Sequence, residues 1–291
     1  MKARYQYRFY PTDQQKNDLA RLFGCVRVVW NDALAICKNY EKLPKSGELQ
    51  KIVITQAKKT EERQWLSEVS VVPLQQSVTD LGIAYKNFFD SCKGKRKGRK
   101  VKPPRFKKRT NKQLARLTRR GFSIQGEGIY LAKIGVVKPI WSRPLPSDPS
   151  SVTIIKDCTD NYFLSFVVDV EPVEIDAKNQ SIGIDLGIKT FAVMSDGSEV
   201  RSPDYSRLDR KLRKAQNKFA KQLKGSNRRE VTRRRIAKIN NEIANKRKDF
   251  LHKLSTKTVV ENQVIVLEDL NVSGMVKNRK LALSYKPARM V

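Results

Sequence analysis

The sequence is poor in the residues that build zinc sites and disulfide frameworks. Its 291 residues include one histidine, His252, and four cysteines without any C-x-x-C spacing, namely Cys25, Cys37, Cys92 and Cys158. A zinc site needs several closely spaced cysteine or histidine ligands, and a disulfide framework needs cysteines in a paired pattern. The sequence therefore predicts neither, and the four cysteines are interpreted as small buried apolar residues.

Acidic residues are also scarce, since 29 aspartates and glutamates stand against 60 lysines and arginines. The resulting net charge of +31 repels itself unless an anionic partner neutralises it. Nucleic acid is the expected partner, and a basic membrane-surface protein is the alternative. No apolar run of transmembrane length occurs, and the N-terminus lacks the apolar core of a signal peptide. We therefore expect a cytoplasmic protein without a membrane partner, and its oligomeric state is not predicted.

The first part of the chain alternates strand and helix patterns, which predicts an α+β architecture. Aromatic residues alternate with basic ones over residues 4–10, the period of a half-buried strand. Three amphipathic helices are expected after the capping box of Thr12 and Gln15, over residues 49–66 and after Pro73. Their aromatic residues Trp30, Tyr85 and Phe88 are assigned to the core rather than to base stacking.

Five further short strands are expected, over residues 122–125, 128–132, 134–137, 152–156 and 162–170. Together with residues 4–10 they predict a small β-barrel of the kind that grips nucleic acid, with the helices inserted into it. A purely structural barrel is the alternative. The predicted domains are residues 1–11 and 93–175 for the barrel, 12–92 for the helical unit and 176–291 for a second domain, which contains a helical hairpin over 203–261.

Basic residues gather in an arm at Lys93–Arg109, where 11 of 17 residues are lysine or arginine, and on the two hairpin helices. Glycines and prolines interrupt the arm, so it is predicted to be mobile and to bind phosphates, a solvated linker being the alternative. Ser202 and Pro203 are expected to cap the first hairpin helix. Arginines at the start of the second oppose its dipole, which favours a phosphate role. The residues assigned to nucleic-acid binding are Lys93, Lys95, Arg96, Lys97, Arg99, Lys100, Lys102, Arg105, Lys107, Lys108, Arg109, Arg119, Arg120, Arg207, Arg210, Lys211, Arg228, Arg229, Arg233 and Arg234.

Two carboxylates follow apolar strand patterns in the second domain. Asp185 lies in the apolar stretch Ser181–Gly187 and is expected at the end of a strand, and Glu268 follows the run Val264–Leu267, which is interpreted as a second buried strand. If the strands are parallel neighbours, both acids lie at one edge of the sheet and suit Mg²⁺ or Mn²⁺, which prefer oxygen ligands. The alternative is that each acid only pairs with one of the many lysines or arginines.

Several short motifs recur in one order along the chain, at Gly183–Lys189, Lys246–Lys253 and Val266–Leu270, and further at Tyr7–Pro11, Ala84–Phe89, Pro104–Lys107 and 278–284. In wording and spacing these motifs resemble those of the TnpB (OrfB) proteins of bacterial and archaeal insertion sequences. These proteins, often labelled transposases, are RNA-guided DNA endonucleases. The resemblance implies a wedge-like barrel with an inserted recognition unit, then an RNase H-like (RuvC) domain with Asp185 and Glu268 as catalytic and metal-binding residues. It also implies guide RNA and DNA as partners in a prokaryotic, nucleoid-associated setting.

The sequence departs from the family pattern after Ser284. The family continues into a zinc ribbon and a third catalytic aspartate, whereas residues 285–291 leave the pattern and Pro287 disfavours a helix there. A C-terminally truncated copy with an incomplete RuvC domain, no zinc and weakly held Mg²⁺ is therefore expected. Two functions remain open: guided DNA cleavage, in which Asp269 or Asp196 replaces the third acid, and nucleic-acid binding without cleavage.

Overall fold

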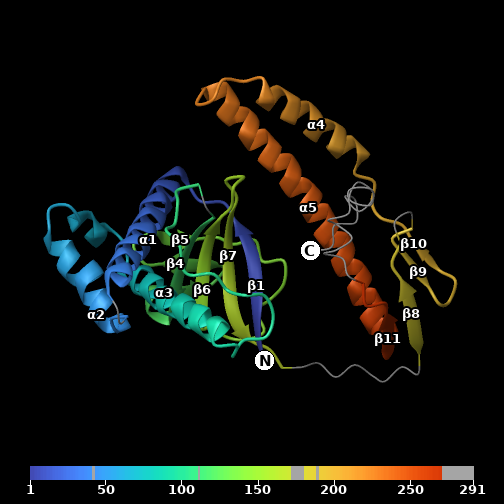
Figure 1. Cartoon of the computed structure of the whole chain (residues 1–291), viewed down its shortest axis with the longest axis horizontal. Helices are drawn as coiled ribbons and strands as arrows, with labels where there is room; N and C mark the ends of the chain where they lie inside the picture. Colours follow the sequence, from blue (N-terminus) through green and yellow to red (C-terminus); the bar gives the residue numbers. More distant parts are fainter. Residues whose placement is uncertain (41–42, 111, 172–179, 188–189, 271–291) are drawn as a thin grey trace. The chain divides into compact units, whose positions relative to one another are not determined.

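The computed structural model describes residues 1–40, 43–110, 112–171, 180–187 and 190–270. The chain divides into two compact units, Met1–Pro172 and Val173–Val291, called here the N-terminal and C-terminal units (Figure 1). Three features of the sequence analysis lie outside the described residues: the boundary predicted within 172–179, the motif at 278–284 and the departure at 285–291. Among the described residues, no helix is both long and apolar enough to cross a bilayer.

The N-terminal unit contains a four-stranded sheet in the order β1-β7-β6-β2, in which every neighbouring pair is antiparallel. Alternate residues such as Tyr7 and Phe9 are buried because successive side chains of a strand point to opposite faces. The four strands are β1 Lys2–Phe9, β7 Tyr162–Asp169, β6 Ser151–Lys156 and β2 Gln113–Thr118. Strands β1, β6 and β7 lie where the sequence predicts them, whereas β2 was not predicted. Strand β2 was missed because its sequence, QLARLT, holds only one β-branched residue.

A second, three-stranded sheet has the order β3-β4-β5, with β3 at Phe122–Gln125, β4 at Gly128–Leu131 and β5 at Gly135–Val137. The three strands lie where the sequence predicts them. A short 3-10 turn, η4 at Arg119–Gly121, connects β2 to β3. In the part of the chain that the structure describes, one isolated bridge, between Phe9 and Pro139, extends the pairing of β1 beyond the four-stranded sheet. A closed barrel therefore remains a proposal.

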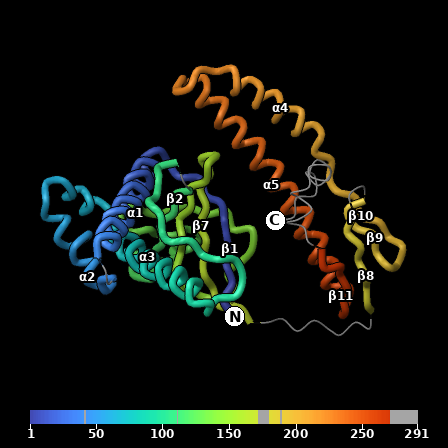
Figure 2. The backbone as a smooth tube through the Cα atoms, viewed as in Figure 1, coloured from blue at the N-terminus to red at the C-terminus, as the bar shows by residue number. Residues whose placement is uncertain are grey.

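Two long helices pack beside the four-stranded sheet, and their packing forms the main core (Figure 2). Helix α1 spans Asp13–Asn39, and the predicted capping box is confirmed, because Thr12 accepts from the Gln15 N–H while the Gln15 side chain accepts from the Thr12 N–H. Helix α3 spans Val71–Cys92 and so begins before Pro73, which a first helical turn tolerates.

The prediction of a single helix over residues 49–66 is wrong. The segment is broken into α2 Ser46–Gln50, the π-helical turn η1 Lys51–Gln56 and the 3-10 turns η2 Ala57–Lys59 and η3 Gln64–Glu68. The break falls at Thr60, whose backbone is extended and whose hydroxyl donates to the Ala57 carbonyl at 2.8 Å. A threonine side chain that bonds its own backbone competes with helix hydrogen bonds and so ends the run.

The C-terminal unit contains a sheet in the order β10-β9-β8-β11 and a helical hairpin. The strands β8 Ser181–Asp185, β9 Ala192–Met194 and β10 Glu199–Val200 form an antiparallel meander, and β11 Val264–Leu267 is parallel to β8. The hairpin helices, α4 Ser206–Ala220 and α5 Asn227–Glu261, pack along a seam of Leu208, Ala215 and Ile239. Both the parallel pairing and the hairpin confirm the sequence predictions.

Three details of the C-terminal unit correct the sequence analysis. Helix α4 begins at Ser206 instead of Ser202, because the Asp204 carboxylate accepts from both the N–H and the hydroxyl of Ser206. The helical spacing of Leu208, Leu212 and Phe219 predicts that Leu223 continues the apolar stripe of the hairpin, but Leu223 is 81% exposed because it lies in the turn after α4. Strand β11, interpreted as buried, is at the edge of the described sheet, and Val266 is 60% exposed.

Candidate nucleic-acid interface and carboxylate site

The parallel pairing of β8 with β11 brings the two predicted acids to the same end of the sheet. Ile184 of β8 is in register with Leu267 of β11, so the next residues along each strand are Asp185 and Glu268. Adjacent parallel strands lie roughly 4.8 Å apart in the hydrogen-bonding direction. The two carboxylates are therefore neighbours across the end of one strand pair, as the sequence predicts.

Neither carboxylate is used to hold the fold together. Asp185 and Glu268 are both exposed, and among the described residues neither takes part in an ion pair. In a chain with 60 basic residues this is notable, because random placement would favour lysine or arginine partners. The alternative explanation, that each acid merely neutralises a nearby cation, therefore lacks support in the described structure.

A glycine shapes the backbone directly after Asp185. The Gly187 N–H donates to the Phe191 carbonyl at 3.3 Å, and a Cβ added at Gly187 would meet the Thr190 carbonyl oxygen at 2.7 Å. Such a contact is too short for any side chain, so only glycine allows the chain to turn here toward β9. The turn keeps the end of β8 free of covering side chains from residue 187.

The two further acids proposed to complete the site differ in their suitability. Asp269 directly follows Glu268 and is exposed. Asp196 lies in the turn after β9, where hydrogen bonds from the Ser198 side chain and from the Ser198 N–H, the latter at 2.8 Å, lower the pKa of its carboxyl group. Ser195 pairs with Gly183, so Asp196 follows toward the beginning of β8 and away from Asp185. The register therefore disfavours Asp196 as a ligand beside Asp185.

The donor set fits a hard divalent cation only in part. Two neighbouring carboxylates offer the oxygen ligands that Mg²⁺ and Mn²⁺ prefer. No group of three or more histidine, cysteine, aspartate or glutamate side chains with metal-binding spacing occurs among the described residues. Cys25 and Cys37 are buried in α1, as predicted, whereas Cys92 and Cys158 are exposed, so the interpretation of all four cysteines as buried apolar residues is wrong for these two.

The basic arm is anchored at one end, which corrects the prediction of an arm without packing. Its first part, Lys93–Lys100, is exposed along its whole length. The second part is held to α1: the Trp30 indole N–H donates to the Arg105 carbonyl at 3.0 Å, and Asn31 exchanges two hydrogen bonds with the Lys107 backbone at 2.8 and 3.1 Å. Side chains of α1 thus supply the hydrogen bonds that this irregular segment cannot make with itself.

Lys107 is placed differently from the other predicted phosphate ligands. Its ammonium lies 3.7 Å from the centroid of the Trp30 ring, a cation–π contact. Burial lowers the pKa of Lys107, and the nearby carboxylate of Asp80 partly opposes this effect. Asp80 itself forms a 2.6 Å ion pair with Arg116 of β2. Lys107 is therefore a half-buried residue that helps to fix the arm, in addition to any role with phosphate.

Arg229 also has a structural role that the sequence analysis missed. Its guanidinium donates to the carbonyls of Phe219 and Gln222 at 2.8 and 2.6 Å and lies 3.9 Å from the centroid of the Phe219 ring. Phe219 lies in the last turn of α4 and Gln222 lies just after it, and cations are stabilising there because the last carbonyls of a helix lack helical partners. Arg229 therefore joins the two helices of the hairpin at their turn.

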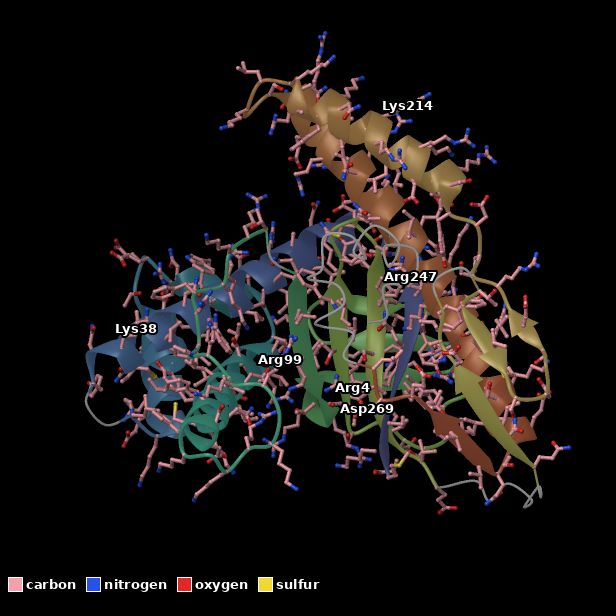
Figure 3. All side chains as sticks on the ribbon, turned by 45° about the vertical axis from the view of Figure 1, so that its right-hand side comes forward. Arg4, Lys38, Arg99, Lys214, Arg247 and Asp269 are labelled. Atoms are coloured by element: carbon pink, nitrogen blue, oxygen red, sulfur yellow. The ribbon has the colours of Figure 1, made fainter. Side chains whose placement is uncertain are left out.

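The remaining predicted ligands are exposed and differ mainly in local pairing. Arg233 and Arg234 both contact Glu230, Arg233 through two bonds of 2.8 and 2.6 Å. Arg207, Arg210, Lys211 and Arg228 are exposed on the hairpin, as are Arg119 and Arg120 in η4. Figure 3 shows nitrogen-tipped side chains along α4, including the labelled Lys214, and in the arm at Arg99. Eighteen of the 20 assigned residues are exposed; Lys107 and Arg229 are half-buried.

The aromatic residues of the helical unit behave in two ways. Trp30 is buried, as predicted, and its ring is covered by Lys107. Near the end of α3, Phe89 is 41% exposed and its ring lies 5.3 Å from that of Phe88 and 6.0 Å from that of Tyr85. The core assignment therefore holds for Trp30, while Tyr85 and Phe88 are only partly buried.

The chain is similar to known proteins over nearly its whole length. Residues 165–279 match a family model described as "Probable transposase", and residues 1–43 match one described as "Helix-turn-helix domain". A relative from Streptomyces pristinaespiralis is 39% identical over 296 residues, which cover 99% of this chain and 72% of the relative. A second, InsQ of Escherichia coli, is 31% identical over 99% of this chain and 70% of its own length. Both are named as candidate RNA-guided DNA endonucleases.

The chain belongs to the TnpB/OrfB family. The resemblance inferred from the motifs is thereby confirmed. A solved complex of Cas12f1 with sgRNA and target DNA is also similar, with a TM-score of 0.46 and 11% identity over 96% of this chain and 67% of that chain. Within the segment matched as helix-turn-helix, the described residues of this TnpB/OrfB protein form β1 and one uninterrupted helix, α1.

Proposed function

We propose that this protein binds a guide RNA and its DNA target and cleaves the DNA with the help of divalent cations held by Asp185 and Glu268. The observation that carries the proposal is the parallel pairing of β8 and β11, which places both exposed acids side by side without ion-pair partners in the described structure. The family membership supports the same conclusion, because the two relatives are named as candidate RNA-guided DNA endonucleases.

We propose that the C-terminal unit cleaves DNA and that the N-terminal unit binds nucleic acid. The meander β8-β9-β10 with the parallel strand β11 is the arrangement expected of an RNase H-like (RuvC) domain, with the helical hairpin inserted before its second acid. The barrel-forming strands of the N-terminal unit and their inserted helices are proposed to bind nucleic acid through the exposed cations of the arm. Phosphate contacts of this kind fix position and supply salt-dependent affinity, while sequence is read elsewhere.

Asp185 and Glu268 would hold the divalent cation, which in such sites activates the attacking water and neutralises charge on the leaving oxygen. The protein's own part is to fix the two carboxylates. The ladder between β8 and β11 fixes their backbone, and the Gly187 turn keeps the end of β8 open. Because like charges side by side repel, the pair is costly without a cation and is relieved by one.

A second candidate function is nucleic-acid binding without cleavage. It is favoured by one observation: the described residues contain no group of three metal-binding side chains, and a site that positions two cations needs more than two carboxylates. Asp269, adjacent to Glu268, is the side chain best placed to add a ligand. Cleavage and binding without cleavage share the RNA and DNA partners and differ only in the completeness of the carboxylate site.

Thermal melting with and without Mg²⁺ tests the metal site. At about 10 mM Mg²⁺ and a dissociation constant of about 1 mM, binding would stabilise the C-terminal unit by about 1.4 kcal/mol. We expect this stabilisation in the parent and in Asp196→Asn, which removes a carboxylate of the same sheet, but not in Asp185→Asn. Equal stabilisation of all three proteins would place the cation elsewhere and refute the site.

Cleavage separates the two functions. The protein is incubated with the RNA that copurifies with it, a library of plasmid targets and Mg²⁺ or Mn²⁺, with Asp185→Ala as the control for contaminating nucleases. Cuts that depend on RNA and disappear in Asp185→Ala establish the endonuclease. RNA-dependent retention of plasmid without cuts in any condition establishes binding alone. Absence of both RNA binding and cleavage rejects the proposed function altogether.

A further inference from the structure

A recess in the N-terminal unit gathers four cations from three separate elements. It lies where α1, the end of the basic arm and the start of β2 meet, and its wall carries Arg27, Lys107, Lys108 and Lys112 but no carboxylate. Arg27 was not among the residues assigned to nucleic-acid binding from the sequence, because it stands alone on a helix whose other face builds the core. The structure brings it beside the arm.

The hydrogen bonds that anchor the arm also set the position of these cations. Asn31 lies four residues after Arg27, so both side chains project from the same face of α1. Asn31 holds the Lys107 backbone at 2.8 and 3.1 Å, which fixes Lys107 and Lys108 beside that face. The convergence of charge is therefore built by specific bonds between two segments that are 76 residues apart in the sequence.

The charges in the recess are not balanced within the described structure. Neither Arg27 nor Lys108 nor Lys112 forms an ion pair there. Arg27 reaches only the neutral Gln113 oxygen, at 3.5 Å, which is longer than a normal N–H···O bond. The carboxylate that acts on Lys107 is Asp80, and it is already paired with Arg116.

Such an arrangement is unfavourable without an anion. Like charges repel, and the burial that lowers the pKa of Lys107 adds a desolvation cost. A phosphate would reduce both the repulsion between the cations and the cost of burying Lys107. It would also accept hydrogen bonds from the guanidinium of Arg27, whose planar donors match phosphate oxygens. The exposed cations of Lys93–Lys100 belong to the same arm, so a polyanionic chain has further contacts available beyond the recess, whereas a free phosphate has none.

We propose that this recess is a phosphate subsite for the nucleic-acid backbone, in which Arg27 and Lys108 bind one phosphate that enters between α1 and the arm. The inference rests on the proposed nucleic-acid-binding function and adds a defined contact to it. It predicts that Arg27 contributes far more to binding than other cations of α1. Arg21 provides the matched control, since it lies on the same helix, carries the same charge and is paired with Glu68 at 3.5 Å.

Fluorescence anisotropy of a labelled single-stranded RNA of mixed sequence and about 30 nucleotides, measured between about 50 and 300 mM KCl, tests the subsite. Arg27→Gln is expected to weaken binding about tenfold and to reduce the slope of log affinity against log salt by about 0.7, the value of one lost phosphate contact. Lys108→Gln, an exposed change that leaves the core untouched, should act in the same direction. Arg21→Gln removes equal charge and should change affinity less than about twofold.

The outcomes are distinct. If the parent binds RNA and Arg27→Gln behaves like Arg21→Gln, the subsite is rejected while the proposed function stands. If the parent binds no RNA, both are rejected. A melting series with inorganic phosphate separates the two sources of the ligand: stabilisation of the parent but not of Arg27→Gln, without any difference in RNA affinity, would assign the recess to free phosphate and overturn the proposal.

Discussion

The two units of the protein bury their apolar residues to very different extents. In the N-terminal unit, side chains from α1, α3 and both sheets form one continuous core in which Leu34, Leu81 and Leu164 are fully buried. In the C-terminal unit, the described cluster comprises Leu208, Ala215 and Ile239, with Leu212, Ile236 and Ile243 partly buried against it. Buried apolar area is the dominant stabilising term in folding, so the units should differ in stability.

The difference indicates a division of roles. In the N-terminal unit, hydrogen bonds from Trp30 and Asn31 of α1 hold the second part of the arm beside the recess. The helical hairpin of the C-terminal unit has many lysines and arginines but only a narrow apolar seam between its helices. Repulsion among these positive charges therefore opposes folding of the hairpin. Nucleic acid or a cation that binds this unit only in its folded form would stabilise it by mass action.

Core truncations should show the largest effect of this difference. Leu81→Ala removes a fully buried side chain and is expected to lower the unfolding free energy of the N-terminal unit by about 2–5 kcal/mol. Leu208→Ala, at the thin seam, should cost its unit about 1–2 kcal/mol because less surface is removed from water. All three tryptophans, Trp30, Trp65 and Trp141, lie in the N-terminal unit, so their fluorescence in urea reports on Leu81→Ala, and circular dichroism of the helical hairpin reports on Leu208→Ala. Equal losses would contradict the comparison.

The turn of the hairpin should show a smaller effect. Arg229→Ala removes two hydrogen bonds to the end of α4 and is expected to destabilise the C-terminal unit by about 1–3 kcal/mol. The neighbouring Arg228→Ala removes the same charge from an exposed side chain and should change stability by less than about 0.5 kcal/mol. Melting followed by circular dichroism measures both. A loss of the same size in the two variants would mean that Arg229 acts only through its charge.

Patterns with a strict period predicted the fold well. The alternation in β1, the capping box at Thr12 and the paired apolar runs ending at Asp185 and Glu268 each depend on local geometry that the sequence specifies directly. The expected parallel pairing of β8 and β11 then followed from one rule, that parallel strands need a long crossover between them.

Features that depend on long-range contacts were not predictable. The anchoring of the arm follows from Asn31 and Trp30, which lie 76 and 75 residues from their partners. Composition alone assigned every cation of the arm and seven cations of the hairpin to phosphate. The structure distinguishes Lys107 and Arg229, which pack, and adds Arg27, which the sequence analysis had left out.

The smallest expected effect is the pH dependence of the basic cluster at the start of α5. Contacts with Arg233, and secondarily with Arg234, lower the pKa of Glu230 from 4.5 to about 2. Because the folded-state pKa is depressed, the contribution of Glu230 to stability is complete above about pH 4.5 and is lost as the pH falls toward 2. The side chain is 44% exposed, so salt should screen the effect.

Comparison of the parent with Glu230→Gln measures this contribution. The parent should melt at a slightly higher temperature than the variant at pH 6 in low salt, since its carboxylate neutralises two arginines near the positive end of the helix dipole. The difference should shrink as the pH approaches 2 and should also shrink in high salt at pH 6. A gap that persists under both conditions would show that Glu230 stabilises α5 by packing or hydrogen bonding independent of its charge. In that case the arginines at the start of α5 would be free to bind phosphate without giving up an ion pair.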